Sequence, residues 1–253
     1  MSILVIFNGE SNSGGQAVNL DLSAAERGQR NAVRILNNTS LVFEPLEIGV
    51  NNLLGHDGLG LTTHGWELGL ANNANKLIPP IYLVKTGQGG SRISEWNTGG
   101  SNYNRFLSRT NEAKQFAISN SINFKPILWY SQGINDAVAS PPTEIATWKT
   151  ATIAHFDKMR LQFPNMPILF SNVTPIYPAF TATIQEICNE YSNCYFISTS
   201  GAAQKDANHW SYDGMKLIAA RMVDKTASIY SLLSNVNTRP KMLPKFKPKY
   251  FYR

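Results

Sequence analysis

Short apolar segments recur along the chain, and segments with helical periodicity separate them. Five apolar segments predict buried strands: Ile3–Phe7, Leu41–Ile48, Ile81–Val84, Ile127–Tyr130 and Ile168–Phe170. A sixth segment, Cys194–Ile197, is a weaker example. Strands that alternate with helices predict a parallel sheet with helices on both faces. We therefore expect a three-layer α/β/α sandwich whose central, mainly parallel sheet has about five strands.

The segments between the predicted strands carry apolar residues at the spacing of one helix face. Ser23 and Glu26 form a capping-box pattern, and we read Ala32, Val33 and Leu36 as the apolar face of the helix that follows. Four further helices are expected around Trp66–Ala71, over Asn102–Ile118, over Ile145–Phe163 and from Met215 to Leu233.

Length and hydrophobic content suit a single α/β domain, and two small domains are the alternative. With 253 residues, 43% of them hydrophobic, it can bury a full core, and we expect one domain over residues 1–237 followed by a tail over 238–253. No apolar run reaches the roughly 18 residues that a membrane span needs. A signal-type segment is also absent from the N-terminus, which predicts a cytoplasmic or virion-associated protein.

The positive charge is concentrated in the tail. The formal net charge is +6, and residues 239–253 hold six lysines and arginines and no acid, so residues 1–238 carry no net charge. A neutral body argues against nucleic acid as a partner. Three prolines and four aromatic residues interrupt the basic ones. We expect an extended tail that mediates assembly, either as a homo-oligomer or with a larger partner.

Cysteine usage indicates no metal site. Cys188 and Cys194 are the only cysteines, and no second pair of Cys or His lies nearby to complete a zinc pattern. Two reduced thiols are the expected state, and a disulfide between them is the alternative.

The first predicted strand runs directly into Gly9-Glu10-Ser11-Asn12. A serine delivered to the end of a buried strand is a candidate nucleophile. For an isolated serine, a turn cap is the better interpretation, so the choice between the two roles depends on the loops after the other strands.

The loops after the third and fourth strands could supply hydrogen-bond donors. The third strand ends in a glycine-rich turn in which the Gly89 N–H could hold an oxyanion, although a tight turn explains the glycines equally well. The fourth strand is followed by Gln132 and Asn135, whose amides could serve the same purpose or could merely cap a turn. The spacing of the glycines matches neither a P-loop nor a dinucleotide fingerprint.

A histidine close to the C-terminal helix is the best candidate base. Asp206 and His209 lie three residues apart, so the carboxylate can hold one imidazole nitrogen while the other faces Ser11. His155 is expected to be structural, and His56 and His64 are the alternative bases.

Aromatic residues gather near the same predicted sheet end. Trp96 and Trp210 lie in loops and are predicted to stack on a sugar ring, whereas at least one of Trp129 and Tyr130 is expected to be a core residue.

Four short blocks, in order along the chain, resemble the SGNH (GDSL-type) hydrolase superfamily, and most closely its sialate O-acetylesterase and acetylxylan esterase branch. They are Gly9-Glu10-Ser11-Asn12, the segment from Gly87 to Trp96, Gln132-Gly133-Ile134-Asn135-Asp136, and Asp206 with His209. The blocks span residues 9–209. Two positions differ from the branch: Glu10 replaces a glutamine, and the third block has the broader Gly-x-Asn-Asp form.

The resemblance implies a role for each block. Ser11 would be the nucleophile, His209 the general base and then acid, and Asp206 the residue that orients it. The N–H groups of Ser11 and Gly89 (or Gly90) and the side chain of Asn135 would form the oxyanion hole, with Gln132 as a rival donor to Asn135.

The resemblance therefore implies a serine esterase that removes O-acetyl groups from a carbohydrate of sialate, xylan or polysaccharide type, without a metal or organic cofactor. An alternative is a structural or carbohydrate-binding subunit of a larger assembly, such as a phage virion, with a vestigial or auxiliary esterase site. An esterase or lipase for apolar substrates is less favoured, because no long apolar lid is visible in the sequence.

Overall fold

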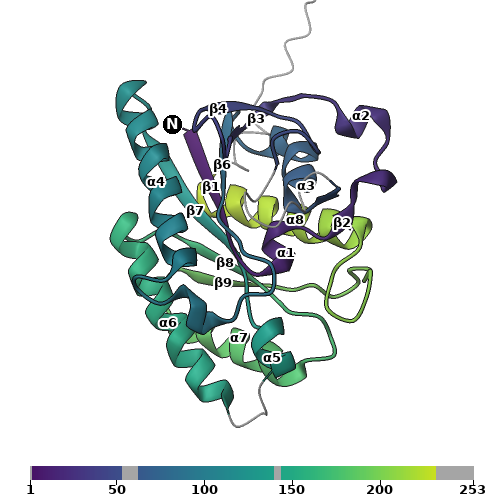
Figure 1. Cartoon of the computed structure of the whole chain (residues 1–253), viewed down its shortest axis with the longest axis vertical. Coiled ribbons are helices and arrows are strands. Elements are labelled where there is room, and N and C mark those ends of the chain that lie inside the picture. Colours follow the sequence, from purple (N-terminus) through teal and green to yellow (C-terminus); the bar gives the residue numbers. More distant parts are fainter. Residues whose placement is uncertain (1, 53–61, 140–143, 232–253) are drawn as a thin grey trace, which may run out of the picture.

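The computed structural model describes residues 2–52, 62–139 and 144–231, and in it a seven-stranded sheet forms the centre of the molecule (Figure 1). The strands are β1 (Ser2–Gly9), β3 (Arg30–Leu36), β4 (Phe43–Leu46), β6 (Ile81–Lys85), β7 (Phe124–Ser131), β8 (Ile168–Ser171) and β9 (Cys194–Ile197). Their order across the sheet is β4-β3-β6-β1-β7-β8-β9, and only the β3–β4 pair is antiparallel. The predicted α/β class and mainly parallel sheet are confirmed.

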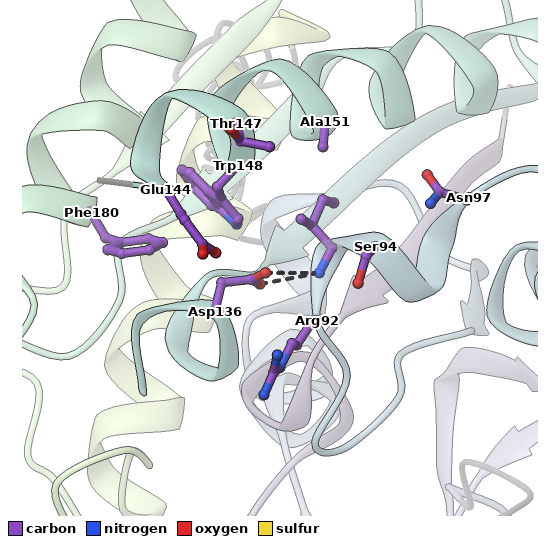
Figure 2. Close-up of a pocket in the computed structure, with 10 residues that line it drawn as sticks. Arg92, Ser94, Asn97, Asp136, Glu144, Thr147, Trp148, Ala151 and Phe180 are labelled. Atoms are coloured by element: carbon purple, nitrogen blue, oxygen red, sulfur yellow. Dashed lines mark hydrogen bonds between the residues drawn. The ribbon is translucent and has the colours of Figure 1, made fainter. Parts of the chain in front are cut away.

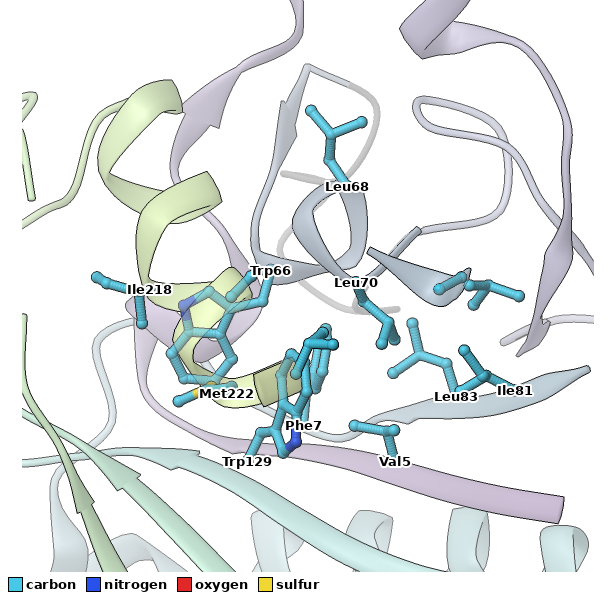
Figure 3. Close-up of a cluster of buried hydrophobic side chains, with 14 of the residues drawn as sticks. Val5, Phe7, Trp66, Leu68, Leu70, Ile81, Leu83, Trp129, Ile218 and Met222 are labelled. Carbon is cyan, nitrogen blue, oxygen red and sulfur yellow. The ribbon is translucent and has the colours of Figure 1, made fainter. Parts of the chain in front are cut away.

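Helices cover both faces of the sheet, because the residues of each strand alternate between two hydrophobic clusters. In β1, Ile3, Val5 and Phe7 join one cluster, and Leu4 and Ile6 join the other. The first cluster includes side chains from α3 (Trp66–Asn72) and α8 (Tyr212–Ile229), and Figure 3 shows its centre around Phe7. The second includes side chains from α4 (Ser101–Ser119), α6 (Ile145–Gln162) and α7 (Pro178–Glu190).

Two sequence predictions about the sheet are wrong. The sheet has seven strands rather than about five, and residues 30–36 form a strand instead of a helix. The capping box of Ser23 and Glu26 is present, but α2 (Ala24–Arg27) ends after one turn. Val33 and Ile35, two residues apart, are buried together in β3, which pairs with β6 and β4. Pairing within the sheet overrides a local pattern that helix and strand could share.

Other elements differ from the prediction mainly in their bounds. The strand expected over Leu41–Ile48 is limited to β4, and the weak candidate Cys194–Ile197 is the edge strand β9. Helix α7, which was not predicted, starts at Pro178, a residue suited to the first helical position. The described ranges also contain α1 (Ser11–Gly14), α5 (Ile134–Ala139) and the β2–β5 ribbon (Ala17–Val18 with Thr63–His64). The short 3-10 helices there are η1 (Asn19–Asp21), η3 (Ala74–Lys76) and η4 (Ile93–Trp96).

Cys188 and Cys194 are free thiols with their sulfur atoms 3.1 Å apart. Helix α8 begins three residues before the predicted start, and the end predicted at Leu233 lies outside the described residues, as does the tail over 238–253. Among the helices of the described ranges, none combines the length and the apolar character that a membrane crossing requires.

Candidate active site

The site lies where the carboxyl ends of the central strands meet. Strand β1 lies between β6 and β7, so the loops that follow these three strands converge at one edge of the sheet. The loop that precedes α8 reaches the same place, because the Asn12 side chain donates a hydrogen bond to the backbone oxygen of Asn208 at 2.9 Å.

A sharp turn between β1 and α1 positions Ser11. Gly9 has φ of +115°, and a Cβ atom there would lie 1.8 Å from the backbone oxygen of Ser131, so only glycine fits. The Glu10 N–H donates to that same oxygen at 2.8 Å. Ser11 is therefore the first residue of α1, with only 6% of its surface exposed.

Ser11 and His209 are brought into contact across 198 residues of sequence. The Nε2 atom of His209 lies 3.1 Å from Ser11 Oγ. On the other side of the ring, Nδ1 lies 2.9 Å from both carboxylate oxygens of Asp206. A proton on Nδ1 is held by this carboxylate, which leaves Nε2 free to accept one from the serine hydroxyl.

Asp206 is held by its own loop as well as by the histidine. Its Oδ1 atom accepts hydrogen bonds from the backbone N–H groups of Asn208 and His209 at 2.8 and 2.9 Å. Partial burial tends to raise the pKa of Asp206, but the His209 ring and these N–H donors together lower it. The Asp206 carboxylate is therefore ionised at neutral pH.

Two residues without a predicted role, Asn12 and Tyr177, fix the histidine loop. Asn12 Oδ1 accepts a hydrogen bond from the Trp210 N–H at 3.3 Å, so this side chain joins α1 to the loop on both sides of His209. The Tyr177 hydroxyl donates to Asn208 Oδ1 at 2.8 Å. Asn12 could have been noticed because it follows Ser11 directly, whereas no local pattern marks Tyr177.

The glycine-rich turn after β6 lies against the first turn. The Gln88 N–H donates to the Gly9 backbone oxygen at 2.8 Å, and Arg105 of α4 holds the Gln88 side chain at 3.0 Å. Within the described residues the N–H groups of Ser11 and Gly89 donate no hydrogen bond. Both are therefore available to a ligand.

Asn135 lies at the start of α5 and its side chain contacts Glu10. Asn135 Nδ2 donates to Glu10 Oε2 at 3.1 Å, and the backbone N–H groups of Ile134 and Asn135 donate to the same oxygen at 3.1 and 3.2 Å. Burial raises the pKa of Glu10 to about 8, although these donors oppose the shift. The residue before Ser11 thus connects the first and third sequence blocks.

Two residues predicted to stack on a sugar and one predicted oxyanion donor are buried, which corrects the predictions made for them. Trp96 and Trp210 are 1% and 0% exposed, so neither ring can stack on a sugar. Gln132 is fully buried, and its amide donates to the Ser91 backbone oxygen and to Asp136 Oδ2 at 3.3 and 3.2 Å. Loop residues at a sheet end can pack inward, and local sequence does not reveal which do so. Trp129 and Tyr130 are both core residues.

The other described histidines have hydrogen-bond partners different from Ser11. His155 is buried with Nε2 3.3 Å from Asn8 Oδ1, as expected for a structural residue. His64, an alternative base, is also buried, with Nδ1 3.0 Å from Asn19 Oδ1. His56, the other alternative, is not among the described residues.

A cavity of about 290 Å³ is lined by residues that include Ile93, Asp136, Trp148 and Phe180 (Figure 2). Asp136 reaches its edge, with the carboxylate accepting the Ile93 N–H at 3.2 and 3.1 Å, and burial raises the pKa of Asp136 to about 6. Neither Ser11 nor His209 lines this cavity. No cluster of three or more metal-ligating side chains occurs among the described residues.

Comparison with known proteins gives a family match over most of the chain. The model of the family described as "carbohydrate esterase, sialic acid-specific acetylesterase" matches residues 2–228. Among curated proteins, no match was found.

Solved structures share the fold at low sequence identity. A protein from Arabidopsis thaliana is 17% identical, with a TM-score of 0.70 over 92% of this chain and 98% of its own. NanS is 16% identical, with a TM-score of 0.65 over 91% of this chain and 98% of its own. A carbohydrate acetylesterase from Xanthomonas citri is 13% identical, with a TM-score of 0.55 over 89% of this chain and 56% of its own.

Proposed function

Because the chain belongs to the sialic acid-specific acetylesterase family of carbohydrate esterases, it is a carboxylic ester hydrolase, and we propose that Ser11, His209 and Asp206 are its catalytic triad. The observation that carries the proposal is the pair of contacts on His209: Nε2 lies 3.1 Å from Ser11 Oγ, and Nδ1 lies 2.9 Å from the Asp206 carboxylate. The proposed substrate is an O-acetylated carbohydrate.

The proposed reaction has two acyl-transfer steps. Ser11 Oγ attacks the acetyl carbonyl carbon while His209 Nε2 takes the hydroxyl proton. The tetrahedral intermediate collapses, the C–O bond to the sugar breaks, and His209 returns the proton to the sugar oxygen. A water molecule, deprotonated by His209, then attacks the acetyl-serine and releases acetate. Asp206 keeps the imidazole oriented and stabilises its protonated form.

The proposed oxyanion hole uses the N–H groups of Ser11 and Gly89 and the side chain of Asn135. The two N–H groups have no acceptor among the described residues, and the turns that carry all three donors meet at β1. Donors fixed before the reaction stabilise the negative charge that develops on the carbonyl oxygen. Loss of one such donor is expected to lower kcat by roughly 10²–10³-fold.

The test is acetate release from a panel that includes O-acetylated sialic acid and acetylated xylan. We expect Ser11→Ala and His209→Ala each to abolish release while the circular dichroism spectrum stays unchanged. Ser119→Ala, which alters an exposed serine at the end of α4, is the matched control. Normal turnover by Ser11→Ala would end the proposal. Failure of a fluorophosphonate probe to label the folded wild-type protein would instead favour a carbohydrate-binding or structural subunit.

A further inference from the structure

Glu10 precedes the proposed nucleophile, yet its side chain is fully buried. Its Oε2 atom is the acceptor for three donors of one turn: the N–H groups of Ile134 and Asn135 and the side-chain amide of Asn135. Its Oε1 atom has no hydrogen-bond partner among the described residues. No lysine, arginine or histidine of the described ranges pairs with it. The triad mechanism assigns this group no role.

We propose that Glu10 is a positioning residue that works as a neutral carboxylic acid, fixing the Asn135 amide beside Ser11 without adding a negative charge there. The proposal rests on the proposed function, since it concerns the oxyanion hole of the same site.

The hydrogen bonds explain how Glu10 would aim the amide. An asparagine amide carries two N–H hydrogens. One of them is engaged by Glu10 Oε2, which fixes the plane of the amide and leaves the second hydrogen for a carbonyl oxygen. The two backbone bonds to Oε2 hold the start of α5 as well. Because Glu10 is covalently joined to Ser11, nucleophile and donor keep a fixed separation.

The surroundings explain why the carboxyl would be neutral. The titratable groups that act on it are Asp136 of α5, Tyr130 of β7 and Tyr177 of the loop before α7, and none of them is cationic. The Asn12 side chain of α1, which also lowers the pKa of Glu10, is uncharged and therefore supplies no counter-ion. A carboxylate without a counter-ion is costly to bury, and burial raises the pKa of Glu10 to about 8. A negative charge here would oppose an oxyanion that forms nearby.

The experiment compares kcat and KM from pH 6 to 10 for wild type, Glu10→Gln, Glu10→Ala and Asn135→Ala. Glutamine keeps an acceptor oxygen without the titration, so we expect Glu10→Gln to retain kcat within about threefold at pH 7 and to lose the wild-type decline above about pH 8. Glu10→Ala should lower kcat by about 10- to 100-fold with little change in KM. It should cost little more when added to Asn135→Ala, because both changes remove the same donor.

Glu190→Gln, which alters an exposed carboxylate on α7, is the matched control and should reproduce the wild-type profile. The proposal is overturned if Glu10→Gln loses as much kcat as Glu10→Ala, or if it keeps the wild-type alkaline decline.

A readout without turnover keeps the two proposals separable. In protein with ¹³C-labelled glutamate side chains, assigned with Glu10→Gln, the Glu10 carboxyl should remain protonated at pH 6.5. A carboxyl already ionised at that pH would refute the inference even in an inactive protein. Absence of acetate release and of probe labelling in the wild type would refute only the proposed function.

Discussion

At the scale of single residues, a buried polar network supports the first turn of the site. Asn8 donates to Thr86 Oγ1 at 2.8 Å, and the Asn8 side-chain oxygen lies 3.3 Å from His155 Nε2. The His155 ring is surrounded by the rings of Trp96, Tyr103 and Tyr130. Burial lowers the pKa of His155 to about 3, so this histidine is neutral in the folded protein throughout the physiological range.

His155 should make the protein sensitive to acid. Below pH 6.5 the unfolded chain binds a proton at this histidine, while the folded chain does not until about pH 3. Folding is therefore opposed increasingly as the pH falls through this window, by up to about 1.4 kcal/mol per pH unit. Urea unfolding at pH 7 and pH 5 should show a larger loss for wild type than for His155→Gln. Equal losses would contradict the prediction.

Ionisation of Glu10 changes the folding stability with pH in the opposite direction to that of His155, so wild type has to be compared with His155→Gln. The folded-state pKa of Glu10, about 8, lies above the usual glutamate pKa of 4.5, so its contribution to stability is complete at low pH and declines as the pH rises through this range. Between pH 4.5 and 6.5 the two residues act in opposite directions, and the wild-type pH dependence alone cannot separate them.

The residues best predicted from sequence are those whose placement depends on short connections. Ser11 follows β1 directly, and Asp206 and His209 share one turn. Their contacts therefore follow once the end of β1 and the histidine loop are placed at the same edge of the sheet. The roles assigned to Trp96 and Trp210 were wrong because both indoles pack into the core, a consequence of tertiary contacts. Glu10 differs from the residue typical of the branch, which the sequence alone reveals. Its hydrogen bonds to the turn after β7 could not be predicted, because they depend on the pairing of β1 with β7.

At the scale of secondary-structure elements, the buried ion pair of Lys85 and Glu67 contacts the C-terminal end of α1. Lys85, the last residue of β6, donates to the Gly14 backbone oxygen at 2.9 Å and to Glu67 Oε1 at 3.0 Å. The two side chains are 1% and 0% exposed. Burial tends to raise the pKa of Glu67, but Lys85 and the Asn52 side chain together lower it below its usual value, so the Glu67 carboxylate remains ionised.

Lys85→Met should therefore destabilise the protein strongly. The substitution leaves Glu67 buried without its cation and removes the donor that holds the end of α1, for an expected loss of about 3–5 kcal/mol in urea unfolding. The double variant Lys85→Met/Glu67→Gln should recover part of this loss, because the uncompensated charge is gone. A single variant as stable as the wild type would show that the ion pair does not support this turn.

Element types were easiest to predict where periodicity was long. Helices α4, α6 and α8 were anticipated from sustained apolar spacing over 18 or 19 residues. Strand β3 was missed because Ala32, Val33 and Leu36 fit a helix face as well as a strand, and only pairing with β6 decides between them.

At the scale of the whole molecule, strand order brings the site together. With β6 and β7 on either side of β1, three loops meet at the point where a ligand can bind an open α/β sheet. The loop before α8 contributes the histidine from far along the chain. The family match ends at residue 228, and α8, the last helix of the described ranges, ends at Ile229.

The tail is predicted to act in assembly rather than in catalysis. Deleting residues 238–253 removes six positive charges and no acid, which changes the formal net charge from +6 to zero. If the tail mediates assembly, we expect light scattering to give fewer subunits per particle for the shortened protein, after correction for the 16 deleted residues, than for the full chain. Acetate release should persist, since the proposed triad lies within residues 11–209. A variant in which the tail lysines are changed to glutamine keeps the aromatic residues, so its light scattering shows whether assembly depends on the charge or on aromatic contacts. An unchanged number of subunits per particle after deletion would show that the tail is dispensable for assembly.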